Sequence, residues 1–327
     1  RLEHGPMTLA PQRMTGVFTD LVTPFRHGAL DLIGLKTLVE WQVRSGVSGL
    51  VVCGEGGEAP VLNDAERVAV ISTTLEVTAG TVPVLVGTGT NATERTIALT
   101  REARALGADA AVVVVPYYSK PTQEGLFRHV EAVASAVDLP LIIVNRPRHT
   151  AIDVSPALLE RFAGLSGIVG FADYAGDISR PLVLREQDRR RIPRNGMPHG
   201  GLPVYSGDDR TALALGLMGA QGTFSLAANV APRLVVAMHH AFHGGNVSAA
   251  RTLQQTLYPL FIAIDAEQAV AATKQALAFV LGLAPDVRLP LTEVEQPVVA
   301  EIRQALSLLA VPAKGLVSGD PSLHRPA

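Results

Sequence analysis

The feature of this sequence that most constrains its fold is a regular alternation between short β-branched runs and longer amphipathic stretches, which starts at Gly16. Runs that are apolar along their whole length are typical of strands buried on both faces, and therefore of parallel sheets. We expect strands at 17–22, 49–53, 83–87, 110–115, 141–145, 168–171, 203–206 and 222–225. Eight strand–helix units favour a (β/α)8 TIM barrel, although strand counting leaves an open doubly wound sheet as an alternative.

The same alternation predicts the domain organisation. The barrel is expected over residues 15–243, followed by a C-terminal helical extension over 244–311 with helices near 247–264, 267–283 and 293–309. Residues 1–14 and 312–327 are expected to be tails. A segment rich in Gly, Pro and Arg, 189–201, interrupts the pattern and predicts a solvated loop at the N-terminal face of the barrel. Asn63 and Asp31 are expected to cap the helices that follow them.

Composition excludes several classes of partner. The net charge is -2 and no basic stripe with interleaved aromatic residues is present, so nucleic acid is not expected. The longest purely apolar run, 110–115, is far shorter than a membrane span, so no membrane partner is expected. A single cysteine and the lack of a signal-peptide pattern favour a cytoplasmic location. A small molecule remains as the expected partner.

Polar side chains gather where the predicted strands end. In a (β/α)8 barrel the reacting groups lie at the C-terminal ends of the strands, so these positions are the candidates for a site. They include Glu55 after the second strand, Tyr117 and Tyr118 after the fourth, Asn145, Arg146 and His149 after the fifth, and Asp173 after the sixth. The sequence therefore predicts a polar mouth.

The segments at the strand ends share an order and spacing with a known family. They include LVTPF (21–25), GEGGE (54–58), PYYSKPTQEGL (116–126), VNRPRHT (144–150), GFADYAGD (170–177) and GTFSLAANVAP (222–232). In these segments the chain resembles the dihydrodipicolinate synthase and N-acetylneuraminate lyase family from about Thr15 to Leu309. The tyrosine pair before Lys-Pro is the most specific element, since little in barrel packing demands it.

The resemblance implies a class I aldolase or dehydratase, in which a lysine at the end of the sixth strand forms an imine with a 2-oxo acid such as pyruvate. Ala172 stands at that position in this chain. Glu55 and Gly56 stand where the resemblance implies threonines, Val144 where it implies a tyrosine, and His149 where it implies a carboxylate-binding arginine. Tyr118 matches, and the resemblance implies that it reaches into the pocket of a neighbouring subunit.

These differences lead to an expectation for the site. Glu55 and Asp173 are expected to carry acid–base chemistry, with Tyr118 as a further catalytic residue. Ligand binding is expected from Gly56, Gly57, Tyr117, Asn145, Arg146, His149, Ala172 and Phe224. Two alternatives stay open: that Glu55, His149 and Asp208 form a metal site, or that the carboxylates only cap helices and pair with Arg146 or Arg148. Arg146 either binds a ligand carboxylate or pairs with Asp173. No metal and no cofactor are expected.

Two functions are compatible with this pattern. The first is a lyase-family enzyme with a pocket for a small 2-oxo acid or other carboxylate, whose chemistry has diverged from the lysine imine. The second is a non-catalytic binding or regulatory protein on the same barrel. Either would be a homodimer or homotetramer, because Tyr118 is expected at a subunit contact.

Overall fold

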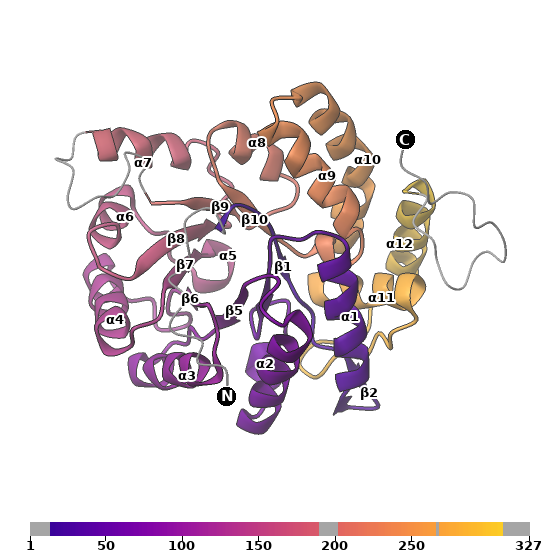
Figure 1. The fold of residues 1–327 in the computed structure, drawn as a ribbon, viewed down its shortest axis with the longest axis horizontal. Helices are drawn as coiled ribbons and strands as arrows, with labels where there is room; N and C mark the ends of the chain where they lie inside the picture. The colour runs from indigo at the N-terminus through magenta and orange to yellow at the C-terminus, as the bar shows by residue number, and fades with distance from the viewer. Residues whose placement is uncertain (1–13, 190–201, 266–267, 310–327) are drawn as a thin grey trace.

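The computed structural model describes residues 14–189, 202–265 and 268–309. Eight parallel strands close into a barrel in the order β1-β10-β9-β8-β7-β6-β5-β4, which confirms the predicted (β/α)8 fold (Figure 1). The strands are β1 (Gly16–Asp20), β4 (Gly49–Val52), β5 (Val84–Gly87), β6 (Ala110–Val114), β7 (Leu141–Asn145), β8 (Ile168–Asp173), β9 (Val204–Ser206) and β10 (Gly222–Ser225).

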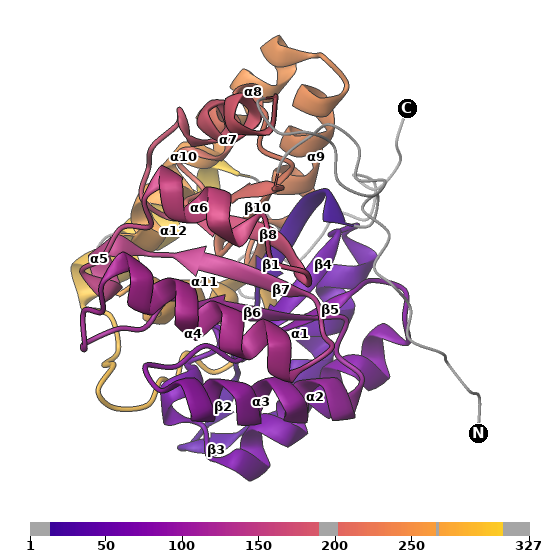
Figure 2. The ribbon, with the colours of Figure 1, turned by 90° about the vertical axis from the view of Figure 1, so that its left-hand side faces the viewer.

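Helices surround the barrel and separate its strands in the chain (Figure 2). They are α1 (Leu32–Arg44), α2 (Asp64–Thr78), α3 (Thr93–Leu106), α4 (Gln123–Ala136), α5 (Pro147–Thr150), α6 (Pro156–Phe162), α7 (Arg180–Arg189), α8 (Ala212–Leu217) and α9 (Pro232–His243), with short 3-10 turns η2 (Ala59–Val61) and η3 (Ala227–Asn229). The predicted caps are present: Asn63 and Glu66 form a capping box on α2, and Asp31 accepts a hydrogen bond from the Gly34 amide on α1.

Three helices follow the barrel, namely α10 (Val247–Asp265), α11 (Ala269–Leu281) and α12 (Gln296–Leu308). In Figure 1 they lie beside α1 and α9. No helix among the described residues is long and apolar enough to cross a membrane. The segment 189–201, for which a loop is predicted, lies outside the described residues except for Arg189, the last residue of α7.

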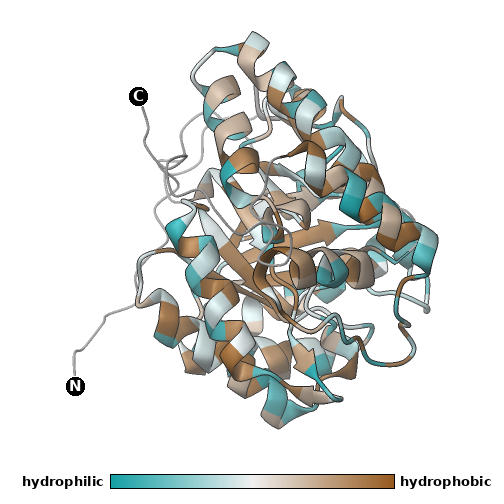
Figure 3. Cartoon of the chain, turned by 90° about the vertical axis from the view of Figure 1, so that its right-hand side faces the viewer, coloured by the Kyte–Doolittle hydropathy of each residue, from teal (hydrophilic) through white to brown (hydrophobic). Residues whose placement is uncertain are grey.

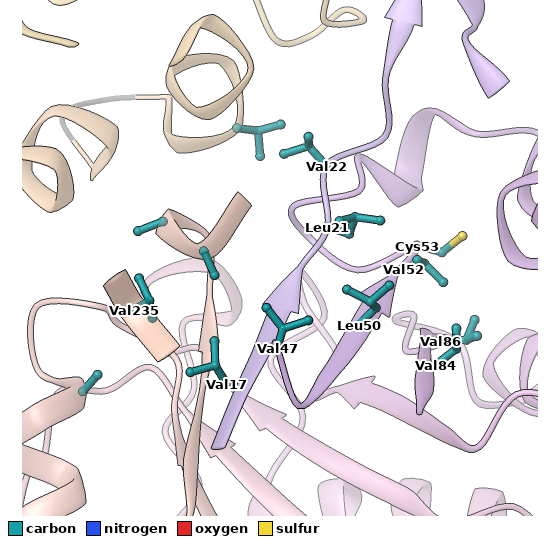
Figure 4. Packing of buried hydrophobic residues seen from close by; sticks show 14 of the residues in the cluster. Val17, Leu21, Val22, Val47, Leu50, Val52, Cys53, Val84, Val86 and Val235 are labelled. Carbon is teal, nitrogen blue, oxygen red and sulfur yellow. The ribbon is translucent and has the colours of Figure 1, made fainter. Parts of the chain in front are cut away.

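Alternation of side chains along the strands produces two separate apolar cores. Figure 3 shows the hydrophobic strands at the centre of the molecule. The outer core joins strands to helices; Figure 4 shows part of it, with Val17, Leu50 and Val84 from the strands and Val235 from α9. The inner core contains no residue of the helices α1 to α12 and fills the barrel. It consists of Met14, Phe18, Val51, Leu85, Ala110, Val112, Ile142, Val144, Ala172, Tyr205 and Phe224.

Three aromatic rings occupy much of the barrel interior. The ring centroid of Phe18 lies 5.8 Å from that of Tyr205 and 5.7 Å from that of Phe224, and the Tyr205 and Phe224 centroids are 5.4 Å apart. The Tyr205 hydroxyl donates a hydrogen bond of 2.7 Å to the carbonyl of Met14. Gly170 leaves room for the same ring, because a Cβ there would lie 2.7 Å from Tyr205 Cε2. The barrel is therefore a packed body, and only its mouth, where the C-terminal ends of the strands lie, remains for chemistry.

Candidate active site

A cavity of about 100 Å³ lies at the barrel mouth. On the same measure a single water needs about 10–15 Å³, so the space suits a small organic molecule. The lining residues come from β1, from the loops after β7, β8, β9 and β10, and from α10 and α11; they are Asp20, Arg146, Arg148, Tyr174, Ala175, Gly176, Gly207, Asp208, Asp209, Arg210, Phe224, Leu226, Ala227, Phe261, Ile264, Asp265 and Ala269. No lysine is among them, within the part of the chain that the structure describes.

Ala172 lies in the inner core on β8, with no exposed surface. It pairs in register with Val144 of β7 and Tyr205 of β9, so its methyl group faces the barrel interior. Phe224, another expected binding residue, is buried in the same core and also lines the cavity. The floor of the mouth is thus apolar and has no nucleophilic side chain at position 172.

Asp20 is a mouth residue that the sequence analysis did not single out. It ends β1 and is only 5% exposed. One carboxylate oxygen, Oδ2, accepts a hydrogen bond of 3.1 Å from the Gly56 amide, and the buried Oδ1 has no hydrogen-bond partner among the described residues. Burial raises the pKa of Asp20 to about 6, although the Gly56 hydrogen bond and the charge of Arg146 oppose the shift.

Glu55 and Arg146 form an ion pair at the rim of the mouth. Arg146 Nη2 lies 2.7 Å from Glu55 Oε1, and His149 Nδ1 lies 3.2 Å from the same oxygen. The Glu55 side chain is 34% exposed. Its partial removal from water outweighs the attraction of Arg146 and raises the pKa of Glu55 to about 7, with the negative charges of Asp20 and Asp265 adding to the shift. Partial burial and the charges of Arg146 and Arg148 lower the pKa of His149, so its imidazole is neutral at neutral pH.

The Tyr174 ring lies among these charges. The Arg146 guanidinium carbon is 4.5 Å from its centroid, a cation–π contact. Burial, followed by the negative charge of Asp20, raises the pKa of Tyr174 well above its ordinary value, so the phenol stays protonated. Gly207 is required beside it, because a Cβ at that position would overlap the ring. Tyr174 thus restricts the mouth and orients Arg146.

The loop after β9 supplies two aspartates with different surroundings. Asp208 pairs with Arg210 at 2.8 Å, and Arg210 also pairs with Asp265 of α10 at 2.7 Å. Asp209 accepts a hydrogen bond of 3.0 Å at Oδ2 from the Ala227 amide, while its buried Oδ1 lacks a hydrogen-bond donor in the described residues. Burial raises the pKa of Asp209 to about 6, against the effect of hydrogen bonds from Ser225 and Ala227. Two carboxylate oxygens in this cavity, Oδ1 of Asp20 and Oδ1 of Asp209, therefore lack donors.

Asp173 and Asn145 belong to a network of hydrogen bonds that includes Arg180. Asp173 accepts hydrogen bonds from Arg180 Nε at 2.9 Å, from Asn145 Nδ2 at 2.9 Å and from the Ala175 amide. Asn145 also donates to Asp153 and accepts from the Val154 amide. Neither residue lines the cavity. These bonds hold the β7 and β8 loops together, and the expected roles of Asp173 in acid–base chemistry and of Asn145 in ligand binding stay predictions. Arg146 correspondingly pairs with Glu55, and Asp173 with Arg180.

The glycines after β4 have tight surroundings. A Cβ on Gly56 would lie 2.7 Å from the Asp20 carbonyl oxygen, and the Gly56 amide is already bound by the Asp20 carboxylate. Gly57 accepts a hydrogen bond from the Thr23 hydroxyl through its carbonyl. The Gly56 amide is therefore engaged by an internal carboxylate, and the expected part of Gly56 and Gly57 in ligand binding stays a prediction.

Tyr117 and Tyr118 lie away from the cavity of their own chain. The side chain of Tyr118 is 90% exposed on a backbone with φ of 69°, and Tyr117 is 36% exposed. Their expected place at a subunit contact stays a prediction. Within the described residues no group of three or more His, Cys, Asp or Glu side chains is arranged to hold a metal ion, which includes the alternative of Glu55, His149 and Asp208.

Comparisons with known proteins extend over almost all of the described chain. Residues 13–309 match the model of the dihydrodipicolinate synthetase family. The 4-hydroxy-tetrahydrodipicolinate synthase of Thiobacillus denitrificans is 43% identical over 278 residues, covering 85% of this chain and 90% of that protein. The dihydrodipicolinate synthase of Thermotoga maritima has a TM-score of 0.86 and 35% identity, covering 91% of this chain and 99% of that chain. The chloride-inhibited dihydrodipicolinate synthase of Acinetobacter baumannii, solved with pyruvate, has a TM-score of 0.85 and 36% identity, covering 91% of this chain and 100% of that chain.

Proposed function

Because this chain belongs to the dihydrodipicolinate synthetase family and has its lyase and aldolase fold, we propose that it binds a small carboxylic acid in the barrel mouth and transforms it by proton transfer rather than through a lysine imine. One observation carries the proposal: Asp20 in the cavity lining, and Glu55 beside the lining residue Arg146, are carboxyl groups whose pKa values lie near neutrality, while the described lining has no lysine. An imine needs an amine within about 3.5 Å of the carbonyl carbon.

Glu55 is the first candidate for the proton-transferring group. With a pKa of about 7 it is present in both protonation states at neutral pH, which is the condition under which a carboxyl group both accepts and donates protons efficiently. Its position beside the His149 imidazole, 3.2 Å away, provides a second group that exchanges protons with it. Asp20, deeper in the mouth, supplies the second carboxyl group.

Arg146 is the candidate for holding the carboxylate of the ligand. Its guanidinium has five N–H donors, and the contact with Glu55 uses one of its nitrogens. The Tyr174 ring fixes the plane of the guanidinium, which favours two parallel hydrogen bonds to a planar acid. Arg148, which lines the same cavity, adds positive charge at the rim.

A second candidate function is binding or regulation without catalysis. The observation that favours it is the Tyr174 ring, which, together with the apolar floor at Ala172 and Phe224, restricts the reach of a ligand into the barrel. A ligand held only at the rim would be bound without contact between its reacting carbon and Asp20.

Two measurements test these proposals. Incubation with pyruvate and borohydride, followed by intact mass measurement, is expected to leave the mass of the protein unchanged; an adduct on a lysine would contradict the proposed chemistry. Proton NMR in D2O of a panel of small 2-oxo, 2-hydroxy and 2-amino acids is then expected to show loss of a C–H signal for the ligand that is transformed. Glu55→Gln should slow that exchange at least a hundredfold. Glu40→Gln, at an exposed pair with Arg44, is the matched control.

Binding of a panel member with no C–H exchange in the wild-type protein would favour the second candidate. A Glu55→Gln rate equal to that of wild type would remove Glu55 from the mechanism while leaving the binding part of the proposal in place.

A further inference from the structure

The loop that carries Glu55 has a strained backbone. It follows β4 and runs from Cys53 to Glu58, and both of these end residues have a positive φ, 52° and 51°, although neither is a glycine. A left-handed backbone costs free energy at a residue with a side chain, so it persists where contacts from outside the segment hold it. The contacts at the Glu58 end therefore bear on the position of Glu55.

Hydrogen bonds inside the loop connect Glu58 to Glu55. The Glu58 amide donates to the Glu55 carbonyl at 3.1 Å, and the Ala59 amide donates to the Gly54 carbonyl at 3.3 Å. The loop is thus a tight turn closed by its own backbone, and a single hydrogen bond links the two glutamates. The position of Glu58 consequently affects the direction in which the Glu55 side chain leaves the backbone.

The Glu58 carboxylate is held by two groups of the C-terminal extension. Lys274 of α11 donates a hydrogen bond to Oε1, and the Arg288 amide donates to Oε2 at 3.1 Å. The side chains of Lys274 and Glu58 are both 2% exposed, so water does not compete for this contact. Lys274 is itself fixed by the Asp286 carbonyl at 2.8 Å and by the Phe25 ring, whose centroid is 4.2 Å away. Each carboxylate oxygen of Glu58 therefore has a donor more than 200 residues further along the chain.

The same extension forms part of the cavity wall. Asp265 of α10 and Ala269 of α11 line the cavity, and the charge of Asp265 contributes to the raised pKa of Glu55. Among the described residues, the other charged or titratable groups that face Glu55 come from the barrel and its loops; they are Arg146, His149, Asp20 and Tyr174. Helix α11 thus contacts the mouth at its first residue and the Glu55 loop at Lys274.

We propose that Lys274 and Glu58 are positioning residues, which hold the loop so that Glu55 stays at its ion pair with Arg146. This inference rests on the proposed function, since it concerns the group to which that function assigns proton transfer. Neither Lys274 nor Glu58 lines the cavity, so the pair acts through the loop and not on the ligand. Without the pair, the loop relaxes from its Glu58 end and Glu55 moves toward water, where burial no longer raises its pKa.

Carbon-13 NMR titration of the carboxyl groups reports on Glu55 in the absence of any ligand, and Glu55→Gln identifies its signal. In wild type the pKa of Glu55 is expected at about 7. Lys274→Met and Glu58→Gln should each lower this pKa by about 1 or more, because the carboxyl group returns to water. The pH dependence of C–H exchange should move in the same direction.

Two further variants separate positioning from stability. The double variant Lys274→Met with Glu58→Gln has no buried charge without a partner, so it should fold even where a single variant does not, and its Glu55 pKa should stay lowered. Glu66→Gln is the matched control. It removes the other ionic contact of the extension, in which Arg288 Nη2 lies 2.6 Å from a carboxylate of α2, and should leave the Glu55 pKa at its wild-type value.

The outcomes distinguish this inference from the proposed function. A Glu55 pKa that is equal in all these proteins, that returns to the wild-type value in the double variant, or that falls equally in Glu66→Gln would overturn the inference and leave the proposed function intact. A wild-type Glu55 pKa near its ordinary value of 4.5 would overturn both.

Discussion

Asp20 ends an otherwise apolar strand, with one carboxylate oxygen on the Gly56 amide and the other without a donor. Its native pKa of about 6 lies above the ordinary value of 3.8. The native state therefore holds this proton more tightly than the unfolded state does. The resulting stabilisation is present at low pH and is lost as the pH rises through about 6.

We therefore expect Asp20→Asn to become more stable relative to wild type as the pH rises from 4 to 7.5. The gain should approach about 3 kcal/mol, since one pKa unit corresponds to about 1.4 kcal/mol. Urea unfolding of both proteins across this range measures the difference. The titration of Glu55 adds to it in the same direction, because loss of the Asp20 charge removes one cause of the raised pKa of Glu55. Parallel pH profiles would contradict the expectation.

Asp173 gives a second prediction at this scale. Its side chain and that of Arg180 are 1% and 4% exposed, and removal of one partner leaves a buried charge. Asp173→Ala should lower the free energy of unfolding by about 3 kcal/mol, because Asp153 compensates Arg180 only in part. Asp177→Asn is the matched control: that exposed carboxylate lies 4.0 Å from the same guanidinium and should change stability by less than about 0.5 kcal/mol. Urea unfolding curves at pH 7.5 provide the comparison.

The positions of Asp20, Asp173 and Asn145 show that the prediction of the site did not consider which face of a strand each residue occupies. Candidates were taken by their nearness to strand ends, without regard to which face of the strand each occupies. Ala172 faces the inner core, so its neighbour Asp173 has to face outward. Likewise Val144 faces the inner core and its neighbour Asn145 faces outward. The same alternation puts Asp20 on the inner side, two residues after Phe18. Strict use of the period of two would have placed Asp20 on the inner face of β1 and Asp173 on the outer face of β8. The Glu55–Arg146 contact joins loops far apart in the sequence and matches one of the alternatives left open there, in which a carboxylate pairs with Arg146.

At the scale of elements, the barrel strands agree with prediction to within one or two residues, since each is an apolar run with clear polar or glycine boundaries. The hairpin of β2 (Phe25–Arg26) and β3 (Ala29–Leu30) was missed, because two-residue strands carry no measurable period. The attachment of the C-terminal helices to the barrel is ionic as well as apolar. Lys274 of α11 pairs with Glu58 in a contact where both side chains are 2% exposed.

This attachment supports a prediction. Lys274→Met should lower the free energy of unfolding by about 3–5 kcal/mol, because it leaves the Glu58 carboxylate buried without its cation. Lys274→Met with Glu58→Gln should recover most of the loss, since the charge is then removed as well. Lys36→Met, at an exposed pair with Glu76, is the control and should have little effect. Chemical denaturation of wild type, Lys274→Met, the double variant and Lys36→Met measures these differences. A double variant as unstable as Lys274→Met would show that the pair stabilises the fold through packing rather than charge.

At the scale of the whole molecule, apolar side chains remain on the surface. Tyr118 is 90% exposed on a positive-φ backbone, and Tyr117 stands beside it. Exposed aromatic residues of this kind mark interfaces between subunits. We expect sedimentation at micromolar concentration to show at least a dimer, and Tyr118→Ala to weaken the association tenfold or more. Ile33→Ala, which removes an 81% exposed apolar residue from α1, is the comparison. A wild-type monomer would remove the basis for this expectation.

The separation of the inner core from the outer core has a consequence for how such a barrel diverges. The packing of strands against helices depends on one set of residues, and the mouth rests on another set that contains no residue of the helices α1 to α12. Substitutions inside the barrel therefore act on contacts that the strand–helix packing does not share. The chain is 43% identical to a synthase over 278 residues, and its mouth is lined by Asp20, Asp208, Asp209 and Tyr174 among others. In a barrel whose inner and outer cores are separate, a small number of substitutions at the mouth can therefore change the chemistry of the site.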